Sequence, residues 1–280
     1  MKNSILKQLK EFYPNTNISD ISEIRYKDGI FVGSVEIDNQ KLVVKYFENP
    51  QHAVEIDNYK LLEKLNVPTP KIFHSSQNLL VMENLNFNPN YHLATNDDLK
   101  NLGTITALAK WYKTLHTKGK TIDVTNFYSE LDFITKENLE NLKAILPNWE
   151  NLELMLKNIE KLLRKIKSLP LTITYNDFAE ENMIAGENFA MMYDHNKMGK
   201  GLAYFDIQNV CFMLDENMKK AFNEEYGEIP EIEKLAYDLL IPFITLIMAS
   251  KMPQFPRWAT PYITKAYDVE IKKLIMKFIS

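Results

Sequence analysis

The sequence predicts an α+β protein of two lobes, a small antiparallel sheet with one packed helix and a larger, mainly helical lobe. Residues 21–47 alternate between apolar and polar side chains around two short turns, which is typical of an antiparallel meander. Residues 99–167 place apolar side chains at helical spacing. Residues 216–280 are again helical and are punctuated by prolines. We expect the small lobe to cover residues 1–85 and the helical lobe to cover residues 86–280.

Composition indicates an ordinary globular chain. Its 280 residues are 45% hydrophobic and 25% charged, and the net charge of -4 argues against a nucleic-acid partner. Cys211 is the sole cysteine, so no intrachain disulfide can form, which fits a reducing compartment. The first residues lack the apolar core of a secretory signal, and the longest apolar stretch, residues 239–249, is too short to span a bilayer. We expect a cytoplasmic protein without a membrane partner.

The small lobe is expected to begin with a short amphipathic helix that ends before Pro14. A second helix follows the meander and stops at Val67-Pro68-Thr69-Pro70, because proline cannot continue a helix. Alternation and turn residues predict strands at 21–27, 30–38 and 41–47, the second helix at 53–65, and two short strands within 71–76 and 78–85.

Lys45 stands inside an otherwise apolar strand. A strand lysine usually faces solvent, but a lysine here can also be the one that pairs with nucleotide phosphates and is held by a glutamate of the next helix. That helix carries two candidates, Glu55 and Glu63. The first turn of the meander offers only Gly29 and, further on, Gly33, which is much poorer than G-x-G-x-x-G. It is either an ordinary hairpin turn or a reduced phosphate cover.

The most informative residues surround a predicted strand at 171–175. Asp177 and Asn182 follow this strand with the spacing D-x-x-x-x-N, and a second short strand at 189–193 ends on Asp194. In protein kinases the Asp of this spacing is the base and the Asn binds the metal. Magnesium prefers such oxygen ligands. The spacing alone is weak evidence because the chain is rich in Asp and Asn, so the prediction depends on the other parts appearing in order.

The helical lobe is expected to contain a helix at 99–116 that ends at Gly119. A second helical region covers 137–167 and is broken at Pro147.

Taken in order, these parts resemble the aminoglycoside phosphotransferase and choline-kinase-like small-molecule kinases, which share the protein-kinase-like fold. The resemblance runs from about residue 20 to residue 210 and selects Glu55 as the partner of Lys45. LLVMENL resembles the hinge of these kinases, which implies that the backbone around Glu83 and Leu85 holds the adenine. ALAKWYKTLH, LTITYNDFAEEN and MMYDHN resemble the helix ending in Leu-His, the catalytic loop and the metal-binding strand.

The resemblance implies a Mg²⁺-dependent phosphotransferase that moves the γ-phosphate of ATP or GTP to a hydroxyl group of a small molecule. An aminoglycoside, a choline-like amino alcohol or a sugar would be the acceptor. Lys45, held by Glu55, would neutralise the α- and β-phosphates. Asn182 and Asp194 would hold the magnesium. Asp177 would orient the acceptor hydroxyl and accept its proton.

Two departures from the family pattern leave an alternative open. The usual His-Gly before the catalytic Asp is Tyr175-Asn176 here, although tyrosine can support the loop and Asn tolerates left-handed backbone angles. With the glycine-poor turn, this departure makes a catalytically weak nucleotide-binding or interaction module on the same fold the alternative. Asp206 is expected to brace the catalytic loop.

The acceptor is expected to lie against the C-terminal helices. Acidic residues between 215 and 233 either attract a cationic acceptor or form a solvated helix face. Trp258 and Tyr262 either contribute to an aromatic cage for a quaternary amine or pack against neighbours. The histidines show no metal-ligand spacing, so we expect them to be packing or surface residues.

Overall fold

The protein was analysed as a computed structural model that describes residues 1–145 and 148–280. Pro147, where the sequence predicts a helix break, lies outside the described residues. The helices are α1 Lys2–Phe12, α2 Val54–Lys64, α3 Leu102–Gly119, α4 Lys136–Ile145, α5 Glu150–Lys157, α6 Ile159–Lys167, α7 Ala203–Met213, α8 Glu216–Tyr226, α9 Glu231–Ser250, α10 Thr260–Tyr267 and α11 Val269–Ile279. The strands are β1 Ser22–Lys27, β2 Ile30–Ile37, β3 Gln40–Phe47, β4 Ile72–Ser75, β5 Leu79–Glu83, β6 His92–Leu93, β7 Thr172–Thr174, β8 Met183–Gly186, β9 Phe189–Met192 and β10 Gly199–Gly201.

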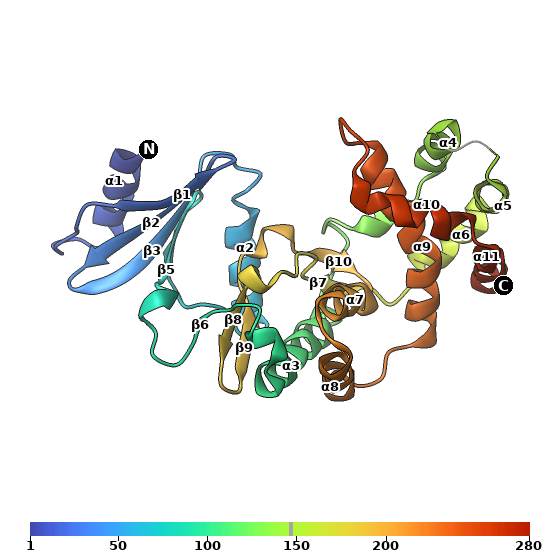
Figure 1. Ribbon diagram of the computed structural model, residues 1–280. Helices are drawn as coiled ribbons and strands as arrows, with labels where there is room; N and C mark the ends of the chain where they lie inside the picture. The colour runs from blue at the N-terminus through green and yellow to red at the C-terminus, as the bar shows by residue number, and fades with distance from the viewer. Residues whose placement is uncertain (146–147) are drawn as a thin grey trace. The chain divides into compact units, whose positions relative to one another are not determined.

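The first five strands form one antiparallel sheet in the order β1-β2-β3-β5-β4 (Figure 1). Helix α1 covers one face, where Ile5 and Leu9 pack with Phe31 and Val44. Helix α2 packs on the other face, where its apolar residues meet Leu80 and other side chains of β3 and β5. The predicted mixed fold, a small antiparallel sheet with one packed helix followed by a mainly helical part, is therefore confirmed.

The spatial contacts between residues divide the chain into two compact units. The first unit contains residues 1–118, 175–198 and 209–226, and the second contains the remaining residues. The predicted lobes at 1–85 and 86–280 are a different partition, and that partition stays a prediction.

Within the first unit, β8 and β9 form a hairpin that the sequence did not predict as a pair, because β8 is short and follows a polar stretch. Met183 pairs with Met192 and Gly186 pairs with Phe189, and β6 adds a third strand beside β8. This hairpin places Asn182 and Asp194 at the same end of the ladder, since both lie just outside the Met183–Met192 pair.

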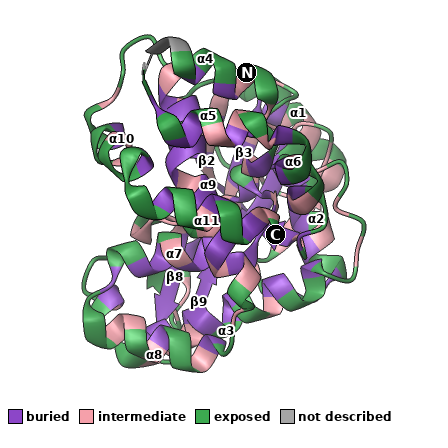
Figure 2. Cartoon of the chain, turned by 90° about the vertical axis from the view of Figure 1, so that its right-hand side faces the viewer, coloured by how far each residue is buried: buried purple, intermediate pink, exposed green. Residues whose placement is uncertain are grey.

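The second unit is built around α9. Most of the length of α9 is buried, including Pro242 and Phe243, and Figure 2 shows this helix largely in the colour of buried residues. Trp149 at the start of α5 stacks on Phe243 and donates its indole N–H to the Ala266 oxygen at 2.8 Å. Within the part of the chain that the structure describes, no helix is both long enough and apolar enough to cross a membrane.

The structure gives a packing reason for Gly33. Gly33 is buried in β2, and a Cβ there would lie 2.6 Å from Ile21 Cγ2 and 2.8 Å from Phe31 Cε1. Close packing on the α1 face explains this glycine, so it does not belong to a phosphate cover.

Candidate active site

Lys45 lies at the centre of the candidate site. Its Nζ is 2.6 Å from Glu55 Oε2 and 3.0 Å from Asp194 Oδ1. Strand β3 supplies the lysine, helix α2 supplies Glu55, and the end of β9 leads to Asp194. Three segments of the first unit therefore meet at one ammonium group.

The ion pair between Lys45 and Glu55 is buried. Lys45 is 8% exposed and Glu55 is 1% exposed, so neither charge is well solvated. Burial alone would lower the pKa of Lys45, but the carboxylates of Glu55 and Asp194 outweigh it, so the pKa of Lys45 is raised. Burial raises the pKa of Glu55 to about 7, while Lys45 acts in the opposite direction. The lysine is thus held in its cationic form.

Asp194 has an unusual backbone. Its φ of 61° lies in the left-handed region, which a non-glycine residue rarely adopts, and strained residues of this kind concentrate at functional sites. The Tyr59 hydroxyl accepts the Asp194 N–H at 3.4 Å, and Asn58 donates to the oxygen of His195 at 2.7 Å. One face of α2 therefore holds the backbone around Asp194.

Asp177 and Asn182 contact each other across the loop that joins β7 to β8. The Asn182 amide nitrogen donates to the Asp177 main-chain oxygen at 3.1 Å and to its Oδ2 at 3.3 Å. The main-chain oxygen of Asn182 accepts the N–H of Tyr193 at 3.0 Å, so the loop is attached to the residue before Asp194. Burial raises the pKa of Asp177, and nearby Lys197 lowers it. The four-residue gap between Asp177 and Asn182 thus folds into one local hydrogen-bonded turn.

The Tyr175-Asn176 pair has a structural explanation. Tyr175 is fully buried, and its hydroxyl donates to the Tyr193 main-chain oxygen. Asn176 has φ = 65°, a backbone conformation that glycine adopts without strain and that Asn tolerates better than most residues. Its side chain also donates to the Lys197 oxygen at 3.1 Å. Both replacements therefore keep the loop attached to the β9–Asp194 segment.

His195 is a packing residue. Its ring is fully buried and lies against Tyr59, Trp111 and Tyr175, with centroids 4.8–6.3 Å apart. Burial lowers the pKa of His195 to about 3, so the ring is neutral. His116 is also buried, and its Nδ1 lies 2.9 Å from the Tyr226 hydroxyl.

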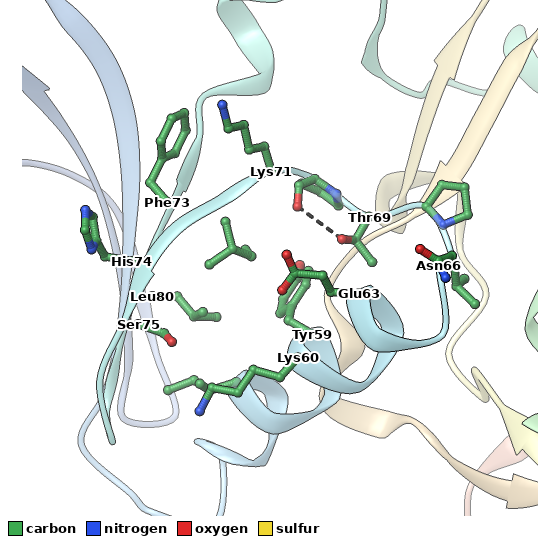
Figure 3. Close-up of a pocket in the computed structure, with 15 residues that line it drawn as sticks. Tyr59, Lys60, Glu63, Asn66, Thr69, Lys71, Phe73, His74, Ser75 and Leu80 are labelled. Atoms are coloured by element: carbon green, nitrogen blue, oxygen red, sulfur yellow. Dashed lines mark hydrogen bonds between the residues drawn. The ribbon is translucent and has the colours of Figure 1, made fainter. Parts of the chain in front are cut away.

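Glu63, the rival partner for Lys45, lies elsewhere on α2. It lines a cavity of about 800 Å³ between α2 and β4, together with Lys60 and Phe73 (Figure 3). Two turns of helix separate it from Glu55. The ion pair with Lys45 is therefore made by the glutamate that the family resemblance selected.

Glu83 and Leu85 are the residues around which the family resemblance predicts the adenine to bind. Glu83 ends β5, and its N–H donates to the Lys71 oxygen at 3.0 Å, so this N–H is already occupied. The Glu83 carboxylate accepts the Lys71 N–H at 2.7 Å and contacts Tyr91. Leu85 begins a short 3-10 helix and is buried. Adenine binding at this position stays a prediction.

The residues around Asp194 fit a magnesium ion. Asp194 offers a carboxylate that is 29% exposed. The amide nitrogen of Asn182 is used by Asp177, so the group that Asn182 can offer is its amide oxygen. Carboxylate and amide oxygens are hard ligands of the kind that magnesium takes in phosphate-binding sites.

Sequence reasoning missed three residues of this region. Asn58 is three residues after Glu55, so it lies on the same helix face, and a polar residue at that spacing was the signal. Tyr59 stands among the apolar residues of α2, so nothing in the sequence indicates that its hydroxyl accepts the N–H of Asp194. Lys197 reaches Asp177 electrostatically, and no sequence signal distinguishes it from other exposed lysines.

The chain has the fold of the protein-kinase-like small-molecule kinases. The features of this fold are the antiparallel sheet with its lysine, the helix glutamate, and the two loops that follow β7 and β9. Solved structures with this fold match the chain over nearly its full length. A choline/ethanolamine kinase family protein from Mesorhizobium loti has a TM-score of 0.63 at 12% identity, with 99% of each chain covered. A choline kinase from Cryptosporidium parvum has a TM-score of 0.59 at 17% identity, covering 100% of this chain and 98% of the other.

A putative fructosamine-3-kinase from Thermobifida fusca also has a TM-score of 0.59, at 14% identity, covering 98% of this chain and 99% of the other. No protein-family model and no curated protein matches the chain in sequence. The resemblance indicated by the sequence motifs is thus confirmed at the level of the fold.

Proposed function

We propose that the protein is a magnesium-dependent phosphotransferase that moves the γ-phosphate of ATP or GTP to a hydroxyl group of a small molecule. The observation that carries this proposal is the contact of Lys45 Nζ with both Glu55 and Asp194. A buried cation between a helix glutamate and a loop aspartate is the arrangement that kinases require for phosphate binding. The structural relatives support the reaction class, because their names describe kinases of small molecules.

Each residue has a chemical role in this proposal. Lys45, oriented by Glu55, binds the α- and β-phosphate oxygens. Asn182 and Asp194 hold magnesium, which supplies positive charge to the phosphate oxygens. Asp177 orients the acceptor hydroxyl and receives its proton. The acceptor oxygen forms a bond to the γ-phosphorus, the bond from that phosphorus to the β–γ bridging oxygen breaks, and the nucleoside diphosphate leaves with the electron pair.

The acceptor class is also a proposal. The relatives named above are a choline kinase, a choline/ethanolamine kinase family protein and a putative fructosamine-3-kinase. Hydroxyl compounds that carry an amine are therefore the first acceptors to test, followed by aminoglycosides and sugars.

The deciding experiment measures thermal stability with ATP and with GTP, each with and without magnesium. A ligand that binds only the folded state raises the free energy of unfolding by about 2.7 kcal/mol at a hundredfold excess over its dissociation constant. We expect a magnesium-dependent increase for one of the nucleotides. If neither nucleotide changes the stability, the catalytic roles must be withdrawn.

Turnover then separates an enzyme from a nucleotide-binding module. Asp177→Ala should abolish phosphate transfer and leave nucleotide affinity nearly unchanged, because its interaction with the acceptor proton develops in the transition state. Asp194→Ala should remove the magnesium-dependent part of binding. Wild-type protein that binds Mg-nucleotide but transfers phosphate to no amine, aminoglycoside or sugar would favour the module.

A further inference from the structure

The turn between β1 and β2 is poorly built for binding phosphate through its backbone. It consists of Asp28 and Gly29, with φ angles of 52° and 75°, which is the tight two-residue turn of an ordinary hairpin. Asp28 adds a negative charge at this position. Gly33 is packed on the α1 face of the sheet, as described above. The phosphates of a nucleotide therefore need another positive group from this part of the sheet.

The pairing register places such a group beside Lys45. Arg25 of β1 pairs with Val32 of β2, Val32 pairs with Lys45 of β3, and Lys45 pairs with Leu80 of β5. Directly paired residues in an antiparallel sheet project from the same face. Leu80 packs with Tyr59 of α2 on that face. Arg25 and Lys45 thus stand in one row on the α2 face, two strands apart, which is about 10 Å between their backbones.

The charge of Arg25 is available for a ligand. Arg25 is exposed, and among the described residues it has no ion-pair partner, whereas Lys27 lies 3.9 Å from Asp28. Arg25 therefore stands on the face of the sheet that carries Lys45, without a carboxylate in the described part of the chain that neutralises it.

We infer that Arg25 is a second phosphate-binding cation of the nucleotide site, acting with Lys45 in place of a glycine-rich turn. An arginine suits this role because its planar guanidinium donates two parallel hydrogen bonds to a phosphate. This inference rests on the proposed function, since it names the phosphate chain of a nucleotide as the ligand. An exposed arginine on an edge strand could alternatively serve only to prevent strand-to-strand association.

The test compares nucleotide binding by wild-type protein, Arg25→Gln, Arg25→Lys and Lys7→Gln. Lys7 is an exposed lysine of α1, the helix that covers the opposite face of the sheet, so Lys7→Gln removes the same charge away from the site. Dissociation constants for Mg-ATP, ADP and adenosine are measured by calorimetry or thermal shift at fixed ionic strength. The stability of each variant without ligand serves as the folding control.

Loss of one hydrogen bond between a charged side chain and a phosphate should raise the dissociation constant of the nucleotide about tenfold or more. We expect this loss for Mg-ATP and ADP with Arg25→Gln, a smaller loss with Arg25→Lys, and no change with Lys7→Gln. Adenosine, which has no phosphate, should bind all four proteins equally. If wild-type protein binds Mg-ATP and Arg25→Gln binds it equally well, Arg25 has no role at the phosphates and only this inference fails. If wild-type protein binds no nucleotide, the proposed function fails as well.

Discussion

The side-chain amide of Asn58 donates a 2.7 Å hydrogen bond to the main-chain oxygen of His195, and both residues are buried. His195 directly follows Asp194, and Asn58 lies one helical turn after Glu55. The bond therefore connects the helix that carries one partner of Lys45 to the loop that carries the other. Helix α2 thus carries Glu55 itself and holds the Asp194 loop through this amide and the Tyr59 hydroxyl.

Replacement of Asn58 should weaken both the fold and the site. Asn58→Ala removes the 2.7 Å donor of the His195 oxygen, which keeps the longer 3.4 Å bond from the Met198 N–H, and this should cost about 1 kcal/mol in the free energy of unfolding. It should also raise KM for Mg-nucleotide, because Asp194 loses a support of its left-handed backbone. Urea unfolding and steady-state kinetics measure the two effects. Asn223→Ala is the control, because Asn223 is exposed and, among the described residues, its side chain bonds within α8 and to Cys211. Equal losses in both variants would contradict the positioning role.

The Tyr175 hydroxyl should have a measurable structural role. Tyr175→Phe removes the donor to the Tyr193 oxygen while keeping the buried ring. We expect a loss of about 1–3 kcal/mol in the free energy of unfolding, because the oxygen is left without this donor. Tyr46→Phe is a matched comparison, since within the described residues the Tyr46 hydroxyl makes no hydrogen bond, and it should change stability by less than about 0.5 kcal/mol. A neutral Tyr175→Phe would show that ring packing alone supports the loop.

The left-handed backbone of Asn176 predicts an unusual order of stability among variants at this position. With φ = 65°, the position favours glycine, whereas alanine would be strained by its Cβ. Both Asn176→Gly and Asn176→Ala lose the bond to the Lys197 oxygen. We therefore expect Asn176→Ala to be less stable than Asn176→Gly by about 1 kcal/mol. Chemical denaturation of the two variants side by side measures this difference, and equal midpoints with equal slopes would contradict the left-handed conformation.

The pKa of Asp177 predicts the acid side of the activity profile. Burial raises this pKa above that of an exposed aspartate, and Lys197 opposes the shift. Because the base must be ionised, kcat/KM should fall as the pH is lowered through the raised pKa. Lys197→Gln removes the opposing charge, raises the pKa of Asp177 further, and should move the acid limb to higher pH. The measurement is kcat/KM as a function of pH for the wild-type protein and Lys197→Gln. If the acid limb has the same position in both, Asp177 is not its origin.

The sequence was sufficient for the sheet, whereas for Lys45 it left a solvent-facing and a phosphate-pairing lysine open until the family resemblance favoured the second. Alternation and turn residues located β1 to β5 because these signals are local. The choice of Glu55 over Glu63 came from the family resemblance, since both glutamates lie on α2 and periodicity gave no decision. Asn58 was not recognised as a buried donor, because a polar residue on a helix is usually expected to face the solvent. The same expectation missed Glu233, which is fully buried and accepts the N–H of Tyr204 at 3.2 Å.

Backbone conformations were beyond the reach of sequence patterns. The positive φ of Asn176 could be anticipated from the glycine that it replaces, but that of Asp194 could not. Strand β8 was missed because four apolar residues carry too little periodicity to be recognised alone. Its presence becomes visible through pairing with β9, across the turn at Glu187 and Asn188, and with β6 on its other side.

The division of the chain into two units also limits how this site can be inherited or transplanted. The first unit is assembled from three separate stretches of sequence, residues 1–118, 175–198 and 209–226. Lys45 and Glu55 belong to the first stretch, and Asp177, Asn182 and Asp194 belong to the second. A gene fragment ending at residue 118 would encode the lysine and its glutamate without any of the three loop residues. Recombination at a single crossover therefore cannot exchange one unit intact, and a chimera that keeps the site must take both stretches from the same parent.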